Sequence, residues 1–330
     1  TSTTYSLTEA EVNKTITVVA SYTDGHGTPE SVSSAATAAV ANVNDAPTGS
    51  VTITGTATQG QTLTASNTLA DADGLGSISY QWKANGTDIS GATGTTYVLT
   101  EAEVNKTITV VASYTDGHGT NERVTSSPTA AVANVNDLPT GSVTISGTAT
   151  QGQILTAANT LADADGLGSI TYQWKANGTA ISGATSTTYV LTEAEVNKTI
   201  TVVASYTDGH GTPESVSSAA TAAVANVNDA PTGLVTISGT ATQGQILTAA
   251  NTLADADGLG TITYQWKANG TDISGATGTT YVLTEAEVNK TITVVASYTD
   301  GHATPEAVSS SATADVTNVN DAPTGTVTID

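Results

Sequence analysis

The sequence of 330 residues has no cysteine, no methionine and no phenylalanine. Without cysteine the chain has no disulfide, no thiolate metal site and no cysteine nucleophile. Only eight lysines and arginines stand against 30 aspartates and glutamates, which gives a formal net charge of −22. This charge argues against nucleic acid and anionic membranes as partners and makes divalent cations the natural ones. No apolar run reaches the roughly 18 residues of a membrane-spanning helix.

Internal repetition is the strongest feature of the sequence. The three tryptophans, Trp82, Trp174 and Trp266, are 92 residues apart. The segment Asn-Asp-(Ala/Leu)-Pro-Thr-Gly recurs at the same step, and its proline favours an extended, stiff linker. A fixed period of this length is typical of tandem arrays of one folding unit. We therefore expect three full repeats, 46–137, 138–229 and 230–321, joined at these junctions.

The two ends do not complete a repeat. Residues 1–45 match the second half of one, and residues 322–330 match only the first strand of another. Since nothing at the start of the sequence reads as a signal peptide, we expect a stretch of a longer array whose export signal lies outside it. Strand addition from a neighbouring chain is the alternative way to complete the half-repeat.

Within 46–137 the pattern of residues predicts short strands. Alternating or β-branched segments predict strands at 50–54, 61–65, 77–83, 95–99, 107–114 and about 129–135, and Asn85-Gly86 predicts a hairpin. Ile108, Val110, Ala112 and Tyr114 fall on one face, and residues 100–104 have the character of one helical turn. About seven strands with a tryptophan on the third predict an all-β fold, a tandem array of immunoglobulin-like β-sandwich domains without the disulfide.

Three segments carry a family resemblance that covers essentially the whole chain. Tyr-Gln-Trp-Lys at 80–83, Thr-Tyr-Val-Leu-Thr-Glu-Ala-Glu-Val at 96–104 and Thr-Ile-Thr-Val-Val-Ala-Ser-Tyr-Thr-Asp at 107–116 resemble the bacterial immunoglobulin-like repeats of giant surface adhesins. The junction Asn-Val-Asn-Asp-Ala-Pro-Thr resembles linkers of bacterial cadherin-like and RTX-adhesin repeats. The resemblance implies an extracellular stalk, on the cell surface, that calcium stiffens.

Calcium prefers six to eight oxygen ligands, and the sandwich gathers its loops at the two ends of each repeat. Two acidic pieces are therefore the candidate calcium ligands, the junction Asn-Asp pair and the Asp-Ala-Asp-Gly loop. In the four junctions and three loops these residues are Asn44, Asp45, Asn136, Asp137, Asn228, Asp229, Asn320, Asp321, Asp71, Asp73, Asp163, Asp165, Asp255 and Asp257. The alternative is that they only hydrogen-bond their own backbones in turns.

Other chemistry has weaker sequence support. Glu101 and Glu103 of the helical turn and Asp116 of a later loop form a third acidic piece that could converge at the junction, but the two glutamates read more simply as a solvated turn. The single histidine of each repeat (His26, His118, His210 and His302) reads as a loop-tip residue without a histidine partner nearby in sequence. No hydrolase or phosphate-binding motif occurs, so we expect no enzyme. Asn-x-Thr glycosylation sites and a lysine–asparagine crosslink at Lys83 or Lys106 stay open as alternatives.

These observations leave two main hypotheses for the function. The first is a structural extender of an extracellular bacterial adhesin, whose partners are the neighbouring repeats of the same chain. The second is a segment of a self-assembling extracellular filament that contacts copies of itself. Binding of carbohydrate or ice by the threonine-rich strands is a third, although strand propensity already explains the threonines.

Overall fold

The computed structural model describes residues 2–328, and their secondary structure is almost entirely β. The residues fall into two compact units. One contains the chain up to Leu138 together with Asp163–Leu167 and Thr207–Thr212, and the other contains Pro139–Ala162, Gly168–Tyr206 and the chain from Pro213. No helix among the described residues is long and apolar enough to span a membrane.

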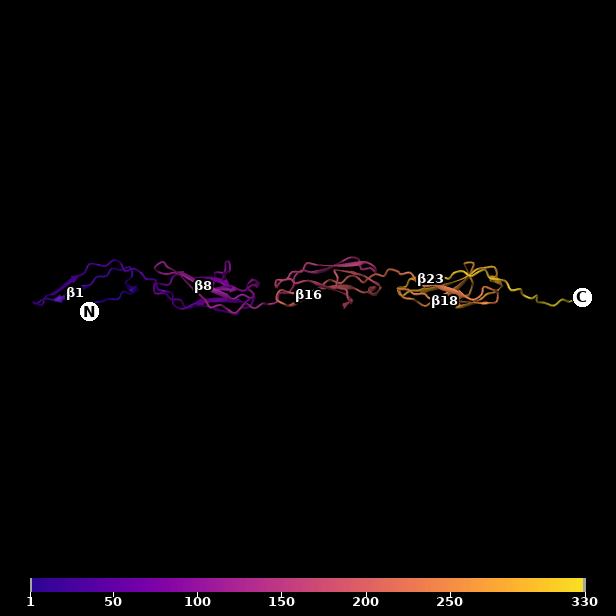
Figure 1. Ribbon diagram of the computed structural model, residues 1–330, viewed down its shortest axis with the longest axis horizontal. Coiled ribbons are helices and arrows are strands. Elements are labelled where there is room, and N and C mark those ends of the chain that lie inside the picture. The colour runs from indigo at the N-terminus through magenta and orange to yellow at the C-terminus, as the bar shows by residue number, and fades with distance from the viewer. Residues whose placement is uncertain (1, 329–330) are drawn as a thin grey trace. The chain divides into compact units, whose positions relative to one another are not determined.

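The first full repeat is a sandwich of two antiparallel sheets. The three-stranded sheet has the order β3 (Val51–Thr54), β4 (Thr62–Asn67) and β7 (Thr96–Val98). The four-stranded sheet has the order β6 (Thr87–Asp88), β5 (Ser79–Ala84), β8 (Ile108–Thr115) and β9 (Asn121–Thr125). Seven strands in two sheets around one core form the predicted immunoglobulin-like sandwich (Figure 1).

The core of this repeat is built around Trp82. Its side chain is fully buried on β5, opposite Val110 of β8, and its indole N–H donates to the carbonyl of Gly94 at 2.9 Å. The predicted face of β8 is confirmed, since Ile108, Val110, Ala112 and Tyr114 are all buried. The other residues of the core lie on strands of both sheets and on the segments that join them (Val51, Leu63, Ala65, Leu69, Ala92, Leu99, Val104 and Val132).

The other two full repeats have the same two sheets. In the second repeat the three-stranded sheet has the order β10 (Val143–Ser146), β11 (Ile154–Asn159) and β14 (Thr188–Val190). Its four-stranded sheet has the order β13 (Thr179–Ala180), β12 (Thr171–Ala176), β15 (Ile200–Thr207) and β16 (Pro213–Ser217). In the third repeat the three-stranded sheet has the order β17 (Val235–Ser238), β18 (Ile246–Asn251) and β21 (Thr280–Val282). Its four-stranded sheet has the order β20 (Thr271–Asp272), β19 (Thr263–Ala268), β22 (Ile292–Thr299) and β23 (Pro305–Ser309). Trp174 and Trp266 occupy the two cores as Trp82 does the first.

The incomplete ends behave differently. Strands β1 (Val19–Thr23) and β2 (Pro29–Ser33) pair as the hairpin that β8 and β9 form in a full repeat, but Tyr22 is 61% exposed where Tyr114 is 4% exposed. The strand expected in 322–330 is not formed over residues 322–328, and residues 329 and 330 lie outside the described part. A strand needs a neighbour for its backbone hydrogen bonds, and the described residues that follow the last junction offer none.

Two details of the prediction for 46–137 were wrong. The segment around 129–135 is not a strand but makes two isolated parallel bridges, Val132 to Val104 and Ala133 to Thr58. The strand that pairs with β8 on the side away from β5 is β9, which was not predicted because its polar and charged residues show no clear alternation of apolar positions. The helical turn is confirmed as a 3₁₀ turn, η2 (Glu101–Glu103). Glu103, however, is buried rather than solvated, because its carboxylate closes the turn.

Tyr97 of β7 packs on Trp82, with 6.1 Å between ring centroids. Burial and the nearby carboxylate of Glu103 raise the pKa of its hydroxyl to about 12, and the same causes act on Tyr189 and Tyr281.

We predict a large cost for removing one core tryptophan. The substitution Trp174→Ala should destabilise the second repeat by about 3–5 kcal/mol, because it deletes a fully buried side chain and leaves a cavity. Urea unfolding followed by circular dichroism should show one part of the transition at lower urea. The exposed Thr156→Ala on β11 is the control, and equal effects of the two changes would contradict the proposed core.

A second prediction concerns alkaline pH. Each of these tyrosine pKa values is raised above the ordinary 10.0, so the stability that the neutral hydroxyls contribute is complete below pH 10.0 and is lost as the pH rises through about 12. Tyrosinate absorbance should show three groups that titrate near that pH. These three should disappear from the titration in the Tyr97→Phe, Tyr189→Phe, Tyr281→Phe chain, and no change in this region would argue against their burial.

Candidate metal sites at the repeat junctions

A backbone hydrogen bond ties each junction to the acidic loop that follows it. The amide N–H of Asp45 donates to Oδ2 of Asp73 at 2.7 Å. The same 2.7 Å bond joins Asp137 to Asp165 and Asp229 to Asp257. The two pieces of sequence predicted to supply calcium ligands therefore lie side by side at three junctions, and each junction lies inside one compact unit.

The Asp-Ala-Asp-Gly loop is held by its own first aspartate. Oδ1 of Asp71 accepts the N–H of Asp73 at 2.9 Å, and Oδ2 accepts the hydroxyl of Tyr114 at 2.5 Å. In the third repeat Asp255 makes the same two bonds, with the N–H of Asp257 and the hydroxyl of Tyr298. These first aspartates thus position the second, which is buried with 3–4% of its surface exposed.

The side chains of the junction pair point to other partners. Oδ2 of Asp137 accepts from Gln59, and Oδ2 of Asp229 accepts from Gln151. Oδ2 of Asp321 accepts from Gln243 in the same way, at 3.2 Å. The amides of Asn44 and Asn228 donate to Glu122 and Glu306, both at 2.8 Å. The asparagine bonds join one repeat to the next, whereas the aspartate bonds stay within one repeat. The role of the pair as a calcium ligand stays a prediction.

A third loop, in the sequence Asp-Gly-His, completes the site. Oδ1 of Asp116 accepts the backbone N–H groups of His118 and Thr120, both at 2.8 Å, so the loop is closed on this carboxylate. Burial alone raises the pKa of Asp116, but these backbone bonds outweigh it and hold the pKa below its usual value. The carboxylate is therefore charged at neutral pH, and its second oxygen, Oδ2, has no hydrogen-bond partner.

The histidine of this loop reaches the 3₁₀ turn of the preceding repeat. Nε2 of His118 lies 2.6 Å from Oε1 of Glu9, and the corresponding pairs His210–Glu101 and His302–Glu193 lie at 2.9 Å. The hydrogen bond to this glutamate raises the pKa of each histidine above its ordinary value. A carboxylate oxygen of the buried aspartate completes the group, and the three ligand atoms lie within 4.8 Å of one another in each of these three groups.

A capping box fixes the turn that presents this glutamate. In η2, Thr100 donates through both its N–H and its hydroxyl to Glu103, at 3.0 and 2.8 Å, and the hydroxyl also accepts from Ala102. Two groups at the start of the turn are thus satisfied by side chains. Glu101 is left with its carboxylate directed to the next repeat.

Several oxygen atoms at these junctions are buried without any hydrogen-bond partner. At the second junction they are Oε2 of Glu101, Oδ1 of Asn134, Oδ1 of Asp165 and Oδ2 of Asp208, and the third has the equivalent atoms of Glu193, Asn226, Asp257 and Asp300. The first has those of Asn42, Asp73 and Asp116. Buried polar atoms are normally hydrogen-bonded, so this recurring set is an exception that needs an explanation.

The asparagine of each set lies between two fixed points. Its segment begins at Val132, which accepts the N–H of Asn105 just after η2, and ends at Asp137 on the acidic loop. The Asp-Gly-His loop is likewise joined to the acidic loop, because Gly209 donates to the carbonyl of Asp165 at 2.9 Å. Every member is thus carried by backbone that contacts the same junction.

Sequence reasoning brought Asp73, Asp165 and Asp257 to the junction, where the structure has them, and their role as calcium ligands stays a prediction. It named the turn glutamates and Asp116 as a third acidic piece but preferred a solvated turn for the glutamates, and it treated the histidines as plain loop tips. It also named the second asparagine of Asn-Val-Asn-Asp and not the first. No local pattern in the sequence indicates the histidine–glutamate contacts, because each joins side chains 109 positions apart, such as His118 and Glu9.

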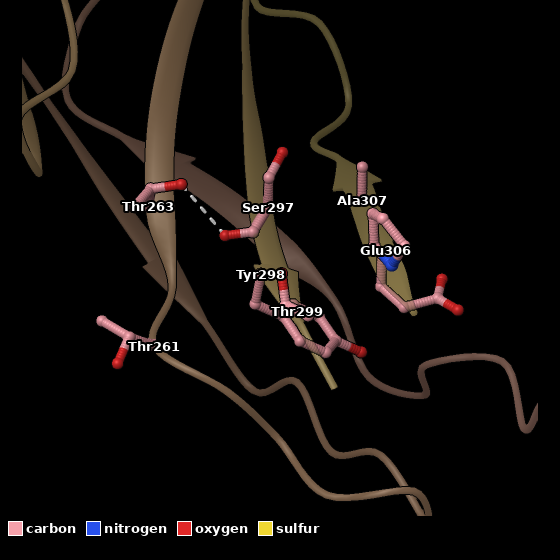
Figure 2. Close-up of a pocket in the computed structure, with 8 residues that line it drawn as sticks. Thr261, Thr263, Ser297, Tyr298, Thr299, Glu306 and Ala307 are labelled. Atoms are coloured by element: carbon pink, nitrogen blue, oxygen red, sulfur yellow. Dashed lines mark hydrogen bonds between the residues drawn. The ribbon is translucent and has the colours of Figure 1, made fainter. Parts of the chain in front are cut away.

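A depression on the threonine-rich sheet of the third repeat bears on whether this face binds a ligand. A depression of about 420 Å³ on the four-stranded sheet of the third repeat is lined by Thr261, Thr263, Ser297 and Glu306, among others. Figure 2 shows Thr263 beside Ser297, and its hydroxyl donates to the Ser297 carbonyl at 3.1 Å. This hydroxyl already has a backbone partner, so strand propensity remains a sufficient account of this face.

No protein-family model and no curated protein match the chain. Solved structures do match. An ice-binding, Ca²⁺-stabilized adhesin of an Antarctic bacterium matches at 16% identity and a TM-score of 0.30, over 92% of this chain and 81% of its own. A tetra-tandem repeat from the extending region of a large adhesion protein matches at 21% identity and 0.32, over 93% and 83%.

The solved structures similar to this chain also include the ICAM-5 D1–D4 ectodomain fragment, at 16% identity and a TM-score of 0.34, over 80% of this chain and 75% of that one. The expected likeness to adhesin repeats is thus present among these structures. Because each TM-score is below 0.5, the fold assignment rests on the two sheets and the core of each repeat.

We predict that the capping box stabilises the turn measurably. The substitution Thr100→Val keeps the shape of the side chain and removes the hydroxyl that bonds Glu103 and Ala102, so the first full repeat should lose about 1 kcal/mol. Thr64→Val, on the exposed face of β4, is the matched control. Equal urea midpoints for the two variants would show that the cap contributes nothing.

Proposed function

We propose that this chain is a stretch of extender repeats from an extracellular bacterial surface adhesin, stiffened by calcium at the junctions between repeats. The repeats are 46–137, 138–229 and 230–321, with parts of further repeats in 1–45 and 322–330. Their role is to hold a binding region away from the cell, and no catalytic role is proposed.

The observation that carries this proposal is the set of buried oxygen atoms without hydrogen-bond partners. At the second junction the set has three carboxylates and one amide, from Glu101, Asn134, Asp165 and Asp208. Oxygen ligands in this number, with carboxylates dominant, match the preference of Ca²⁺, which takes further ligands from carbonyls and water. Leaving a buried acceptor unpaired costs about 1–3 kcal/mol, and more when it is charged, so an empty junction is unfavourable.

The origin of the ligands supports the stiffening. Glu101 and Asn134 belong to the first full repeat, whereas Asp165 and Asp208 belong to the second. An ion that binds all four fixes the end of one repeat against the start of the next. The same division holds for Glu193 and Asn226 against Asp257 and Asp300 at the third junction.

Charge supports an extracellular setting. A chain with a formal charge of −22 repels itself when no cation screens it. Extracellular modules bind calcium with dissociation constants of about 10⁻⁴–10⁻³ M, which suits a structure that is rigid only outside the cell.

The test is calcium titration of the whole chain, followed by melting temperature and by maximum dimension in small-angle scattering. At a tenfold excess of calcium over the dissociation constant each site should add about 1.4 kcal/mol of stability. The melting temperature should therefore rise, the maximum dimension should increase, and a chelator should reverse both changes.

The triple variant Asp116→Asn, Asp208→Asn, Asp300→Asn should lose this response. Its amide oxygen can still accept the two backbone N–H groups of the loop, but an amide nitrogen then replaces the unpaired oxygen. In chelator it should be as stable as the parent chain or more stable, because one negative charge is gone from each junction.

The control is Asp88→Asn, Asp272→Asn, which alters two exposed aspartates that pair with Lys83 and Lys267. It should keep the full calcium response. A parent chain that ignores calcium in both measurements would remove calcium from the account, and concentration-dependent association in its place would favour the self-assembling filament.

A further inference from the structure

Calcium does not account for the histidine at each junction. Ca²⁺ binds oxygen, whereas imidazole nitrogen is a ligand for zinc, copper, nickel and iron. Yet Nε2 of His118, His210 and His302 lies against a glutamate, and each histidine shares its group with the buried aspartate proposed to bind calcium. At the second and third junctions the glutamate, too, is one of the proposed calcium ligands. Two carboxylates and one imidazole within 4.8 Å form a ligand set with a different metal preference from that of oxygen alone.

The buried aspartate is the independent sign that this group binds something. Asp73, Asp165 and Asp257 are 3–4% exposed, and Oδ1 of each has no hydrogen-bond partner. Their Oδ2 atoms are held by the junction N–H, so the carboxylates cannot turn away without losing a 2.7 Å hydrogen bond. Each carboxylate is thus held in the group, where one of its oxygens lies within 4.8 Å of the ligand atoms of the histidine and the glutamate.

The histidine is equally well positioned. Its backbone N–H is bound by the aspartate two residues earlier, at 2.8 Å in His118 and His210 and 2.9 Å in His302. Its side chain is only 21–22% exposed. Zinc–ligand bonds of about 2.0 Å in a tetrahedron place ligand atoms roughly 3.3 Å apart. The observed 2.6–2.9 Å between histidine and glutamate therefore needs to open by only a few tenths of an ångström.

We propose that the Glu–Asp–His group at each junction is a binding site for a divalent transition-metal ion such as Zn²⁺, held by two carboxylates and an imidazole with water in the remaining position. This inference rests on the proposed function in treating the junctions as cation sites. The two ions share the aspartate and the glutamate, so calcium and zinc displace one another.

The chain contains its own control. His26 stands in the same Asp-Gly-His loop, and its N–H is bound by Asp24 at 2.8 Å. Among residues 2–328, however, only the three groups with His118, His210 and His302 bring two carboxylates to a histidine in this way. The structure therefore assigns three zinc ions to this chain of four histidines.

The experiment is Zn²⁺ titration of the whole chain in the absence of calcium, by calorimetry and by ¹⁵N nuclear magnetic resonance of the histidine rings. Three equivalents should bind, and the Nε2 signals of His118, His210 and His302 should shift while that of His26 stays in place. Excess calcium should weaken zinc binding.

The triple variant His118→Ala, His210→Ala, His302→Ala should bind zinc at least tenfold more weakly, since losing even an outer-shell partner of a metal ligand costs that much. His26→Ala is the matched control and should bind zinc as the parent does. The triple variant should still be stabilised by calcium, because all the oxygen ligands remain.

The outcomes separate the two proposals. Zinc binding that ignores the triple histidine change, or equal shifts in all four histidines, would overturn the zinc site while the calcium response stands. Histidine-dependent zinc binding in a chain that ignores calcium would support the zinc site and remove the calcium-stiffened stalk.

Discussion

The hydrogen bond from the junction amide to the buried aspartate is the contact on which the rest of each site depends. In the second junction, the N–H of Asp137 holds Oδ2 of Asp165, and this brings the end of one repeat onto the first loop of the next. Because Oδ2 is occupied, Oδ1 is fixed in a buried position where no protein donor reaches it. The stretch between Val132 and Asp137 is held at both ends, so Asn134 has little freedom.

A fold does not gather unpaired carboxylates at no cost. Each buried acceptor without a partner costs about 1–3 kcal/mol, and like charges in a low-dielectric junction add repulsion. Domains of this size are stable by only about 5–15 kcal/mol, so a junction with four such atoms uses a large share of that stability. Neighbouring carboxylates, by contrast, have hydrogen-bond partners, since Asp71 accepts two hydrogen bonds and Glu103 closes its capping box. The unpaired atoms are thus confined to one place, as expected of a preorganised cation site.

Which of these features could be predicted from the sequence depends on how far apart in the sequence the interacting residues lie. The strands, the buried tryptophan and the face of β8 could be predicted, because alternation and β-branched residues act within a few positions. Strand β9 could not, since its polar sequence leaves register to tertiary contacts. The apolar segment around Val132 was predicted as a strand, but tertiary contacts give it only isolated bridges. The aspartate loops were found because two carboxylates in a turn are visible locally. The contact of His118 with Glu9 was not, because the two residues lie in different repeats and no local pattern joins them.

Because the repeats are nearly identical, the arrangement at one junction recurs along the chain. Near-identical junctions carry the same ligands on the same backbone, so under the proposed function they fill at the same cation concentration. A chain of such junctions then stiffens over one range of calcium rather than link by link. The histidine adds a second level of selection, because an oxygen-only ligand set and a set with one imidazole rank the same ions differently. Asp165 and Glu101 belong to both sets, so under the two proposals calcium and zinc compete for them instead of binding independently.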